Sequence, residues 1–269
     1  MIKIDDEIIK VEHFPDRTQR LKFLPNCHKI SDISFEWKYE SDEELVTLML
    51  LVKHLRNVGY CGSFILFLDY IPNARMDRVH NEEEVFTLKY FSEIINDLGF
   101  DKVVVMDPHS HVSEALLDRI SIITPEGYIK KVIRKISKEF DNLVLFFPDN
   151  GAAKRYAGLF PTYKYVYGNK VRRWEDGVII GTEIVNPFNV DISGKKILII
   201  DDICSKGTTF VKSAEALEKQ NVGEIYLWVT HCENTILEGE VLTNGLIEKV
   251  FTTNSILTAE HEKIEIIDY

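Results

Sequence analysis

The sequence lacks the features that mark several classes of protein. Its four cysteines, Cys27, Cys61, Cys204 and Cys232, are scattered and form no C-x-x-C pair, so neither a zinc site nor a disulfide framework is predicted. No apolar run approaches the roughly 18 residues that span a bilayer, and acidic residues near the N-terminus argue against a signal peptide. We therefore expect a cytoplasmic protein with free thiols and no membrane partner.

Positive charge is also scarce. The 269 residues contain 32 Lys and Arg against 43 Asp and Glu, which gives a formal net charge of -11. Broad binding to nucleic acid is therefore not expected, although local basic clusters can still hold phosphate groups. The sequence contains no G-x-x-x-x-G-K-[ST] and no G-x-G-x-x-G, so neither a P-loop kinase nor a dinucleotide-binding Rossmann domain is supported.

Strand-like and helix-like patterns alternate along most of the chain, which is typical of the α/β class. Two series of such elements meet near residues 124 to 130. The patterns predict helices within 44–59, 84–99 and 127–140, and buried strands within 63–72, 102–109, 142–149 and 195–202. We therefore predict two similar halves, with domains at residues 1–125 and 126–269.

The stretch "ILIIDDICSKGTTF" indicates a ligand site. Four branched aliphatic residues fit a central strand of a parallel sheet, so Asp201 and Asp202 are expected at its carboxyl end, where open α/β sheets bind ligands. A helix is predicted over 210–220, and N–H groups and hydroxyls at a helix start can hold an anion. An ordinary strand-to-helix turn, with Thr208 or Thr209 as N-cap, explains the same pattern.

Three further predicted strands also end in polar clusters, "DYIPNARMDR", "MDPHSH" and "FPDNGAAKR". Mg²⁺ is typically held by one or two carboxylates plus substrate phosphates, and guanidinium groups bind phosphate bidentately. The clusters therefore predict a phosphate and magnesium site, although His109 alone would also fit a hydrogen-bonded histidine at a strand end. The four clusters supply Arg75, Asp77, Arg78, Asp107, His109, Asp149, Lys154, Arg155, Asp201 and Asp202.

A fifth cluster, "GNKVRRWEDG", has no apolar periodicity and is predicted to be a basic loop flanked by glycines. Lys170, Arg172 and Arg173 could close over a transferring phosphoryl group, because catalysis at phosphorus depends mainly on positioning and charge neutralisation. The alternative is a solvated basic turn.

These segments, in this order, resemble the ribose-phosphate pyrophosphokinase family, which makes phosphoribosyl pyrophosphate (PRPP). "DYIPNARMDR" resembles the family's Tyr-Phe-Pro-Tyr-Ala-Arg-Gln-Asp-Arg, "MDPHS" its Asp-Leu-His-Ala metal motif and "FPDNGAAKRYA" its Ser-Pro-Asp-Ala-Gly-Gly segment. "GNKVRR" is similar to its Lys-Arg-Arg loop, and "IIDDICSKGTTF" to its ribose-phosphate loop, Asp-Asp-x-x-Asp-Thr-x-Gly-Thr. The resemblance covers about residues 40 to 256. It implies two phosphoribosyltransferase-like domains, each a mainly parallel sheet flanked by helices.

The resemblance also implies transfer of the pyrophosphoryl group of MgATP to O1 of ribose 5-phosphate, with release of AMP. The catalytic residues would be Lys170, Arg172 and Arg173, and the Mg²⁺ ligands His109 and Asp149. The N-terminal domain would bind ATP through Phe14, Asp16, Arg75, Asp77 and His109. The C-terminal domain would bind ribose 5-phosphate through Asp149, Asp201, Asp202, Ser205, Lys206, Gly207, Thr208 and Thr209.

Phe14 and Asp16 lie in "HFPDRT", which resembles the loop through which the family contacts adenine in a neighbouring subunit. The resemblance therefore implies a homo-oligomer, a dimer or larger. The chain is shorter than the family pattern at both ends, which suits a bacteriophage form and weakens the expectation of the family's hexamer and of its regulation by phosphate or ADP.

The chain departs from the pattern at several positions, among them Val112 and Glu114, which stand where the family has two glutamines after the metal histidine. Ser205 replaces the usual acid of the ribose-phosphate loop, Lys206 replaces its threonine, and Met76 replaces the glutamine on the ATP side. Two alternatives stay open. A nucleobase phosphoribosyltransferase would not explain Arg75, His109 and Lys170, and Ser205 would suit a non-catalytic regulatory subunit.

Overall fold

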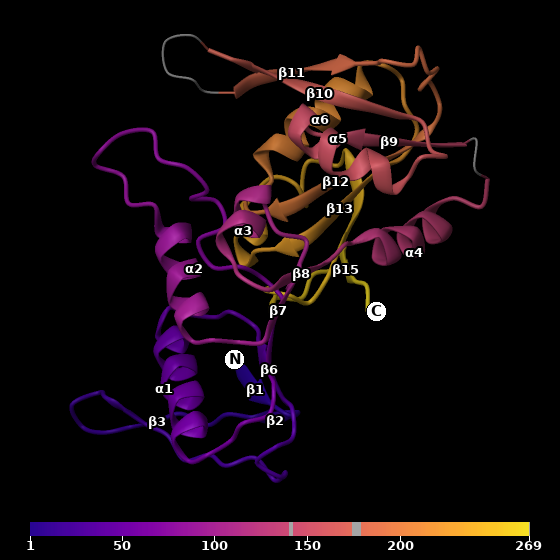
Figure 1. The fold of residues 1–269 in the computed structure, drawn as a ribbon. Helices are drawn as coiled ribbons and strands as arrows, with labels where there is room; N and C mark the ends of the chain where they lie inside the picture. Colours follow the sequence, from indigo (N-terminus) through magenta and orange to yellow (C-terminus); the bar gives the residue numbers. More distant parts are fainter. Residues whose placement is uncertain (140–141, 174–178, 269) are drawn as a thin grey trace. The chain divides into compact units, whose positions relative to one another are not determined.

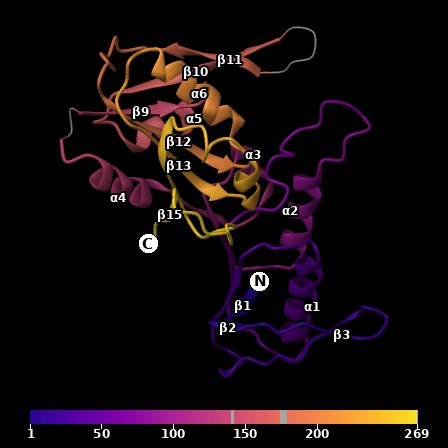
Figure 2. The same ribbon diagram turned by 180° about the vertical axis from the view of Figure 1, so that it is seen from behind.

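The computed structural model describes residues 1–139, 142–173 and 179–268. The chain divides into two compact units, Met1–Thr124 and Pro125–Tyr269, whereas the sequence placed the division after residue 125. Each unit is an α/β structure built on its own sheet, as Figures 1 and 2 show, so the predicted fold class is confirmed. Among the described residues, no helix is long and apolar enough to cross a membrane.

The first unit, residues 1–124, contains a six-stranded sheet in the order β2-β1-β5-β6-β7-β8. Strands β5 to β8 pair in parallel, whereas β1 pairs antiparallel with β2 and β5. A separate short hairpin joins β3 and β4. The elements are β1 (Ile2–Ile4), β2 (Glu7–Ile8), β3 (Glu12–His13), β4 (Gln19–Arg20), β5 (Ile33–Trp37), α1 (Glu43–Asn57), β6 (Phe64–Leu68), α2 (Thr87–Asp97), β7 (Lys102–Met106), α3 (His111–Leu116) and β8 (Ile120–Ile123).

The core of the first unit follows from the apolar periodicity of its elements. Helix α1 buries Leu48, Leu51, Val52 and Leu55, which recur at the spacing of one helix face. Strand β6 alternates buried and half-buried residues, as expected for a strand in a sheet with unequal faces. Because β6 and β7 are parallel neighbours, the loops that follow them leave the same edge of the sheet.

The second unit, residues 125–269, contains a seven-stranded sheet in the order β11-β10-β9-β12-β13-β14-β15. All pairs are parallel except β10 with β11. Strand β9 is buried at all five positions, which is typical of a central parallel strand. The elements are α4 (Glu126–Ile136), β9 (Leu143–Phe147), α5 (Asn150–Tyr156), η2 (Ala157–Leu159), β10 (Tyr165–Arg172), β11 (Ile179–Val185), β12 (Lys196–Cys204), α6 (Thr208–Glu218), β13 (Ile225–Cys232), η3 (Asn234–Glu238), β14 (Ile247–Thr252) and β15 (Ile264–Ile266).

Two local predictions in this unit were wrong. The segment from Gly168, predicted to be a loop, continues strand β10 as far as Arg172 and pairs with β11 at the edge of the sheet (Figure 1). Backbone pairing with β11 holds this segment, and the basic residues at the end of β10 interrupt its apolar pattern, so the sequence carries no periodic signal there. Strand β12 also runs past the two aspartates to Cys204, because Asp201, Ile203 and Cys204 still pair with β13.

Candidate active site

Helix α6 begins at the carboxyl edge of the second sheet without a capping side chain among the described residues. Its N-cap is Gly207, in the left-handed conformation at φ +77°, and Thr208 and Thr209 already lie inside the helix. The alternative in which a threonine caps the helix was therefore wrong. The first N–H groups of a helix need an acceptor, and an anion bound at the loop would supply one.

Two adjacent acids lie just before this helix start. Arg155 Nη2 lies 3.1 Å from Asp202 Oδ1 and 3.9 Å from Asp201 Oδ1, so one guanidinium serves both carboxylates. Burial raises the pKa of Asp201 well above its ordinary value, and the charge of Asp202 adds to this effect while Arg155 opposes it. Among the described contacts, two carboxylates share one guanidinium, an arrangement that suits donors such as sugar hydroxyls or a cation.

Asp149 lies at the end of the neighbouring strand β9 and caps helix α5. Its Oδ1 accepts a hydrogen bond from the N–H of Ala152 at 3.0 Å. Its charge contributes to the raised pKa of Asp201, so Asp149 belongs to the same acidic group. Since β9 and β12 are parallel neighbours, the structure brings together two of the predicted strand-end clusters.

The loop between β12 and α6 has partners in the segment that follows β13. Ser205 Oγ lies 2.9 Å from Thr235 Oγ1, and Lys206 Nζ lies 2.9 Å from Glu238 Oε2. Sequence reasoning did not identify Thr235 or Glu238, and no motif signals them. Both belong to η3, a short 3-10 helix whose approach to the loop depends on the packing of the sheet.

In the first unit, the loops after β6 and β7 are linked. Arg78 binds Asp77 through two bonds, from Nε at 2.7 Å and from Nη2 at 3.1 Å. These bonds are the main cause of the lowered pKa of Asp77, to which a hydrogen bond from Ser110 and the nearby His109 also contribute. The structure therefore brings together the predicted residues Asp77 and His109, while Arg75 lies exposed in the turn after β6.

The hairpin of β3 and β4 carries the predicted adenine-side residues. Phe14 is 48% exposed at the turn. Asp16 Oδ1 accepts hydrogen bonds from the backbone N–H of Thr18 at 3.0 Å and from its hydroxyl at 2.7 Å, which lowers the pKa of Asp16. Asp16 thus holds the turn, whereas the half-exposed ring of Phe14 lies with its centroid 5.9 Å from the guanidinium carbon of Arg20.

The basic cluster is described only in part. The backbone of β10 pairs Lys170 with Thr182 and Arg172 with Ile179, but the side chains of Lys170 and Arg172 lie outside the described part of the structure. Arg173 follows the strand and is exposed. The catalytic prediction for these three residues stays a prediction.

The described residues contain no group of three or more His, Cys, Asp or Glu side chains that could hold a metal ion by themselves. The predicted ligands lie in different units, His109 after β7 and Asp149 after β9.

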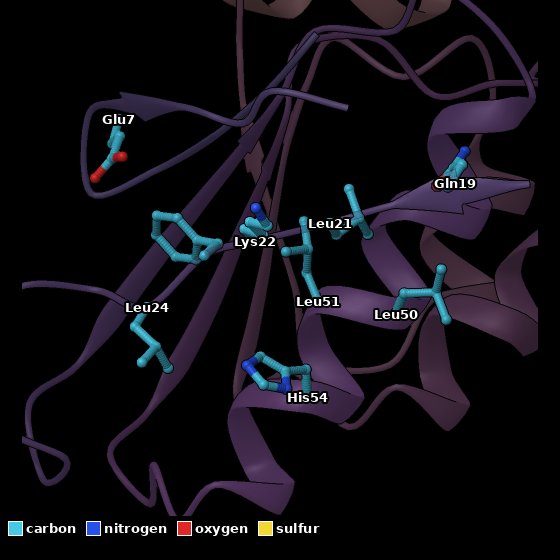
Figure 3. A pocket seen from close by; sticks show the side chains of 9 residues that line it. Glu7, Gln19, Leu21, Lys22, Leu24, Leu50, Leu51 and His54 are labelled. Atoms are coloured by element: carbon cyan, nitrogen blue, oxygen red, sulfur yellow. The ribbon is translucent and has the colours of Figure 1, made fainter. Parts of the chain in front are cut away.

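The first unit also has an open hollow of about 690 Å³ beside α1. Figure 3 shows the lining: leucines from α1 and from the segment after β4, with Lys22 between the leucines of that segment and His54 on α1. Its size is that of a small-molecule pocket. Among the described residues, its lining includes no residue that the sequence predicted for the site; it consists of Glu7, Gln19, Leu21, Lys22, Phe23, Leu24, Leu50, Leu51 and His54.

Comparison with known proteins agrees with this geometry. Residues 182–268 match the model of the phosphoribosyl synthetase-associated domain. A ribose-phosphate pyrophosphokinase from Pyrococcus furiosus is 28% identical over 253 residues, which cover 93% of this chain and 86% of the relative. The chain is a homologue of the ribose-phosphate pyrophosphokinases. An enzyme of that name from Thermococcus kodakarensis is 29% identical, with the same coverage of both chains.

A solved structure shows the same fold. Phosphoribosylpyrophosphate synthetase from Mycobacterium smegmatis superposes with a TM-score of 0.75 at 16% identity, and covers 97% of this chain and 85% of its own. The likeness to this family therefore extends beyond residues 40 to 256, the range that the motifs predicted. The fold of two phosphoribosyltransferase-like units is confirmed.

Proposed function

We propose that the protein is a ribose-phosphate diphosphokinase, a cytoplasmic enzyme that converts MgATP and ribose 5-phosphate into PRPP and AMP. The observation that carries the proposal is the homology, because relatives of that name align with 93% of the chain. In the reaction, O1 of the sugar attacks the β-phosphorus and loses its proton. The bond from the β-phosphorus to the oxygen that bridges it to the α-phosphorus breaks, and AMP leaves.

The start of α6 would hold the sugar substrate. Its N–H groups and the ammonium of Lys206 would bind the 5-phosphate, since the helix dipole and a cation both favour an anion there. Asp201 and Asp202 would accept hydrogen bonds from the ribose hydroxyls. The position of both carboxylates beside the helix start supports the assignment, since Arg155 contacts the two acids and holds them together.

The first unit would bind ATP. Arg75 would contact the phosphates, and Asp77 would keep its place through the two bonds from Arg78. Mg²⁺ would be held by His109 and Asp149 together with phosphate oxygens, and would supply positive charge to the transferred group. Phe14 would stack on adenine in a neighbouring copy of the chain, which makes the enzyme a homo-oligomer.

Lys170, Arg172 and Arg173 would neutralise the charge that grows on the transferred group and on the departing oxygen. Groups of this kind act mainly in the transition state, so their removal lowers kcat more than it raises KM. The resemblance of "GNKVRR" to the family's basic loop supports this role.

The test is to incubate the purified protein with ATP, Mg²⁺ and ribose 5-phosphate and to quantify nucleotides by chromatography. We expect AMP to form only when all three are present, and EDTA to abolish its formation. Lys170→Ala should lower kcat by roughly a hundred- to thousandfold, the loss typical of one well-placed charged or polar group. Formation of ADP and a singly phosphorylated product would overturn the proposal, and consumption of added PRPP with a nucleobase would favour a phosphoribosyltransferase.

A further inference from the structure

The loop between β12 and α6 is held from one side by the segment Glu233–Val241. The N–H of Glu233 donates to the carbonyl oxygen of Cys204 at 2.8 Å, where β12 ends. Ser205 Oγ lies 2.9 Å from Thr235 Oγ1, and that hydroxyl also donates to Glu233 Oε2 at 3.1 Å. The first residues of the loop are thus tied to the segment by backbone and hydroxyl contacts.

The backbones of the loop and the segment also touch. A Cβ atom at Gly239 would lie 1.8 Å from the carbonyl oxygen of Lys206, and a Cβ atom at Gly207 would lie 2.8 Å from Cβ of Val241. Val241 is itself buried. The backbone of the loop therefore has little room to move towards the segment, and the freedom that Lys206 keeps is that of its long side chain.

That side chain already has an anionic partner. Lys206 Nζ lies 2.9 Å from Glu238 Oε2, and the two side chains are 59% and 62% exposed. An ion pair this exposed is weak, because water screens it and two flexible side chains must be ordered. A phosphate dianion at the start of α6 could therefore displace the carboxylate.

We propose that Glu238 is an internal competitor for Lys206, which sets how tightly the loop binds the phosphate of its substrate. In the free protein Glu238 neutralises Lys206, and in the complex the ammonium turns to the phosphate while Glu238 is released to water. Glu238 is on this account a positioning residue that lowers affinity. The inference rests on the proposed function, in which the loop binds ribose 5-phosphate.

The test measures binding directly by isothermal titration calorimetry, with inorganic phosphate and with ribose 5-phosphate as separate ligands. Glu238→Gln should bind both about two- to fivefold more tightly than the parent protein, because an exposed pair contributes little. Glu240→Gln is the matched control, since it removes the same charge from an exposed residue nearby and should leave both affinities unchanged.

A double-mutant cycle identifies the partner. Lys206→Met should weaken binding of both ligands, and Glu238→Gln added to Lys206→Met should bring no further gain, because the competed group is then absent. The gain in the single variant should also shrink at high salt, which screens the pair. A merely structural role for Glu238 would change the thermal midpoint instead of this coupling.

Three outcomes would overturn the role of Glu238 without affecting the proposed function. These are unchanged or weaker binding by Glu238→Gln, an equal gain in Glu240→Gln, and an equal gain when Lys206 has been replaced. If the parent protein binds neither ribose 5-phosphate nor phosphate, the ribose-phosphate assignment of the loop fails together with the inference. Binding of both ligands with no dependence on Glu238 leaves the proposed function standing.

Discussion

The two units differ in how the carboxylates at their strand ends are paired with cations. In the first unit Asp77 has its own guanidinium, because Arg78 binds it through two bonds, and its pKa is lowered. In the second unit Asp201 shares Arg155 with Asp202 and lies near Asp149, and its pKa is raised. Among the described contacts, Asp77 has one cation to itself, whereas Asp201 and Asp202 share one; we call the first arrangement balanced and the second a surplus of negative charge.

This difference indicates which site depends on its ligand. A balanced pair such as Asp77 and Arg78 is satisfied within the protein and mainly holds the loop in place. Buried carboxylates that share one cation lower the free energy of unfolding unless hydroxyl donors or a further cation bind to them. The second unit therefore keeps part of its binding energy for a ligand, and the acids at this edge need not be the residues that stabilise the unit most.

Removal of Arg155 should have the largest effect on stability. Arg155→Met keeps the aliphatic stem but leaves Asp202, only 4% exposed, beside a second acid without this cation. Removing one partner of a buried ion pair typically lowers the free energy of unfolding by about 3 to 5 kcal/mol. Because Arg155 is 20% exposed, we expect a smaller loss of about 2 to 4 kcal/mol. The free energy of unfolding in urea measures the loss.

Arg78→Met is the matched variant in the first unit. Arg78 is 69% exposed and its acid also has Ser110 as a donor, so the loss should be clearly smaller than for Arg155→Met. If Arg78→Met and Arg155→Met lose equal amounts of unfolding free energy, the two units do not differ in the way that their carboxylates are paired.

The pH dependence should have opposite signs in the two units. A raised pKa means that the charged form of Asp201 is disfavoured by folding, so stability is lost as pH rises through the folded pKa. A lowered pKa means that Asp77 stabilises the fold above its ordinary value of 3.8 and that this stability is lost as pH falls through the folded pKa.

Asparagine variants measure these two signs. At pH 7 Asp201→Asn should raise the thermal midpoint of unfolding by a few degrees, because a gain of roughly 1 kcal/mol in unfolding free energy has that effect in a unit of this size. Asp77→Asn should lower the midpoint. The Asp201 difference should shrink as pH falls towards the ordinary value of 3.8, whereas the Asp77 difference should shrink only as pH falls below that value, through the folded pKa. A lower midpoint for Asp201→Asn at pH 7 would show that Asp201 stabilises the unit and that no surplus exists.

The sequence predicted the strands whose ends carry these acids, because runs such as "NLVLFF" and "KKILII" are apolar enough to mark buried strands. It did not predict which acid meets which base. Arg155 lies far from Asp202 in the chain, and their contact depends on β9 and β12 being neighbours in the sheet. The pairing of Lys206 with Glu238 likewise follows from the approach of η3 and has no pattern of its own.

The basic segment shows a different limit. Its lack of apolar periodicity was interpreted as a loop, yet Lys170 and Arg172 belong to β10, which lies next to the edge strand β11 and pairs with it through the backbone. Edge hairpins often carry charged residues, since charge on an edge strand prevents further strand pairing. The absence of an apolar pattern therefore does not distinguish a loop from a strand in a hairpin at the edge of a sheet.

The smallest expected effect concerns Asp149, which has both a capping and an electrostatic role. Asp149→Ala removes the acceptor for the N–H of Ala152 and should cost about 1 kcal/mol of unfolding free energy, as loss of an N-cap usually does. Asp149→Asn keeps a capping oxygen and removes one charge from the surplus, so its stability should equal or slightly exceed that of the parent protein. Urea denaturation separates the two variants, and AMP formation measured beside it shows whether the charge serves the reaction. If Asp149→Asn is as unstable as Asp149→Ala, the carboxylate is needed for more than the cap, and the negative surplus cannot be a cost to the second unit.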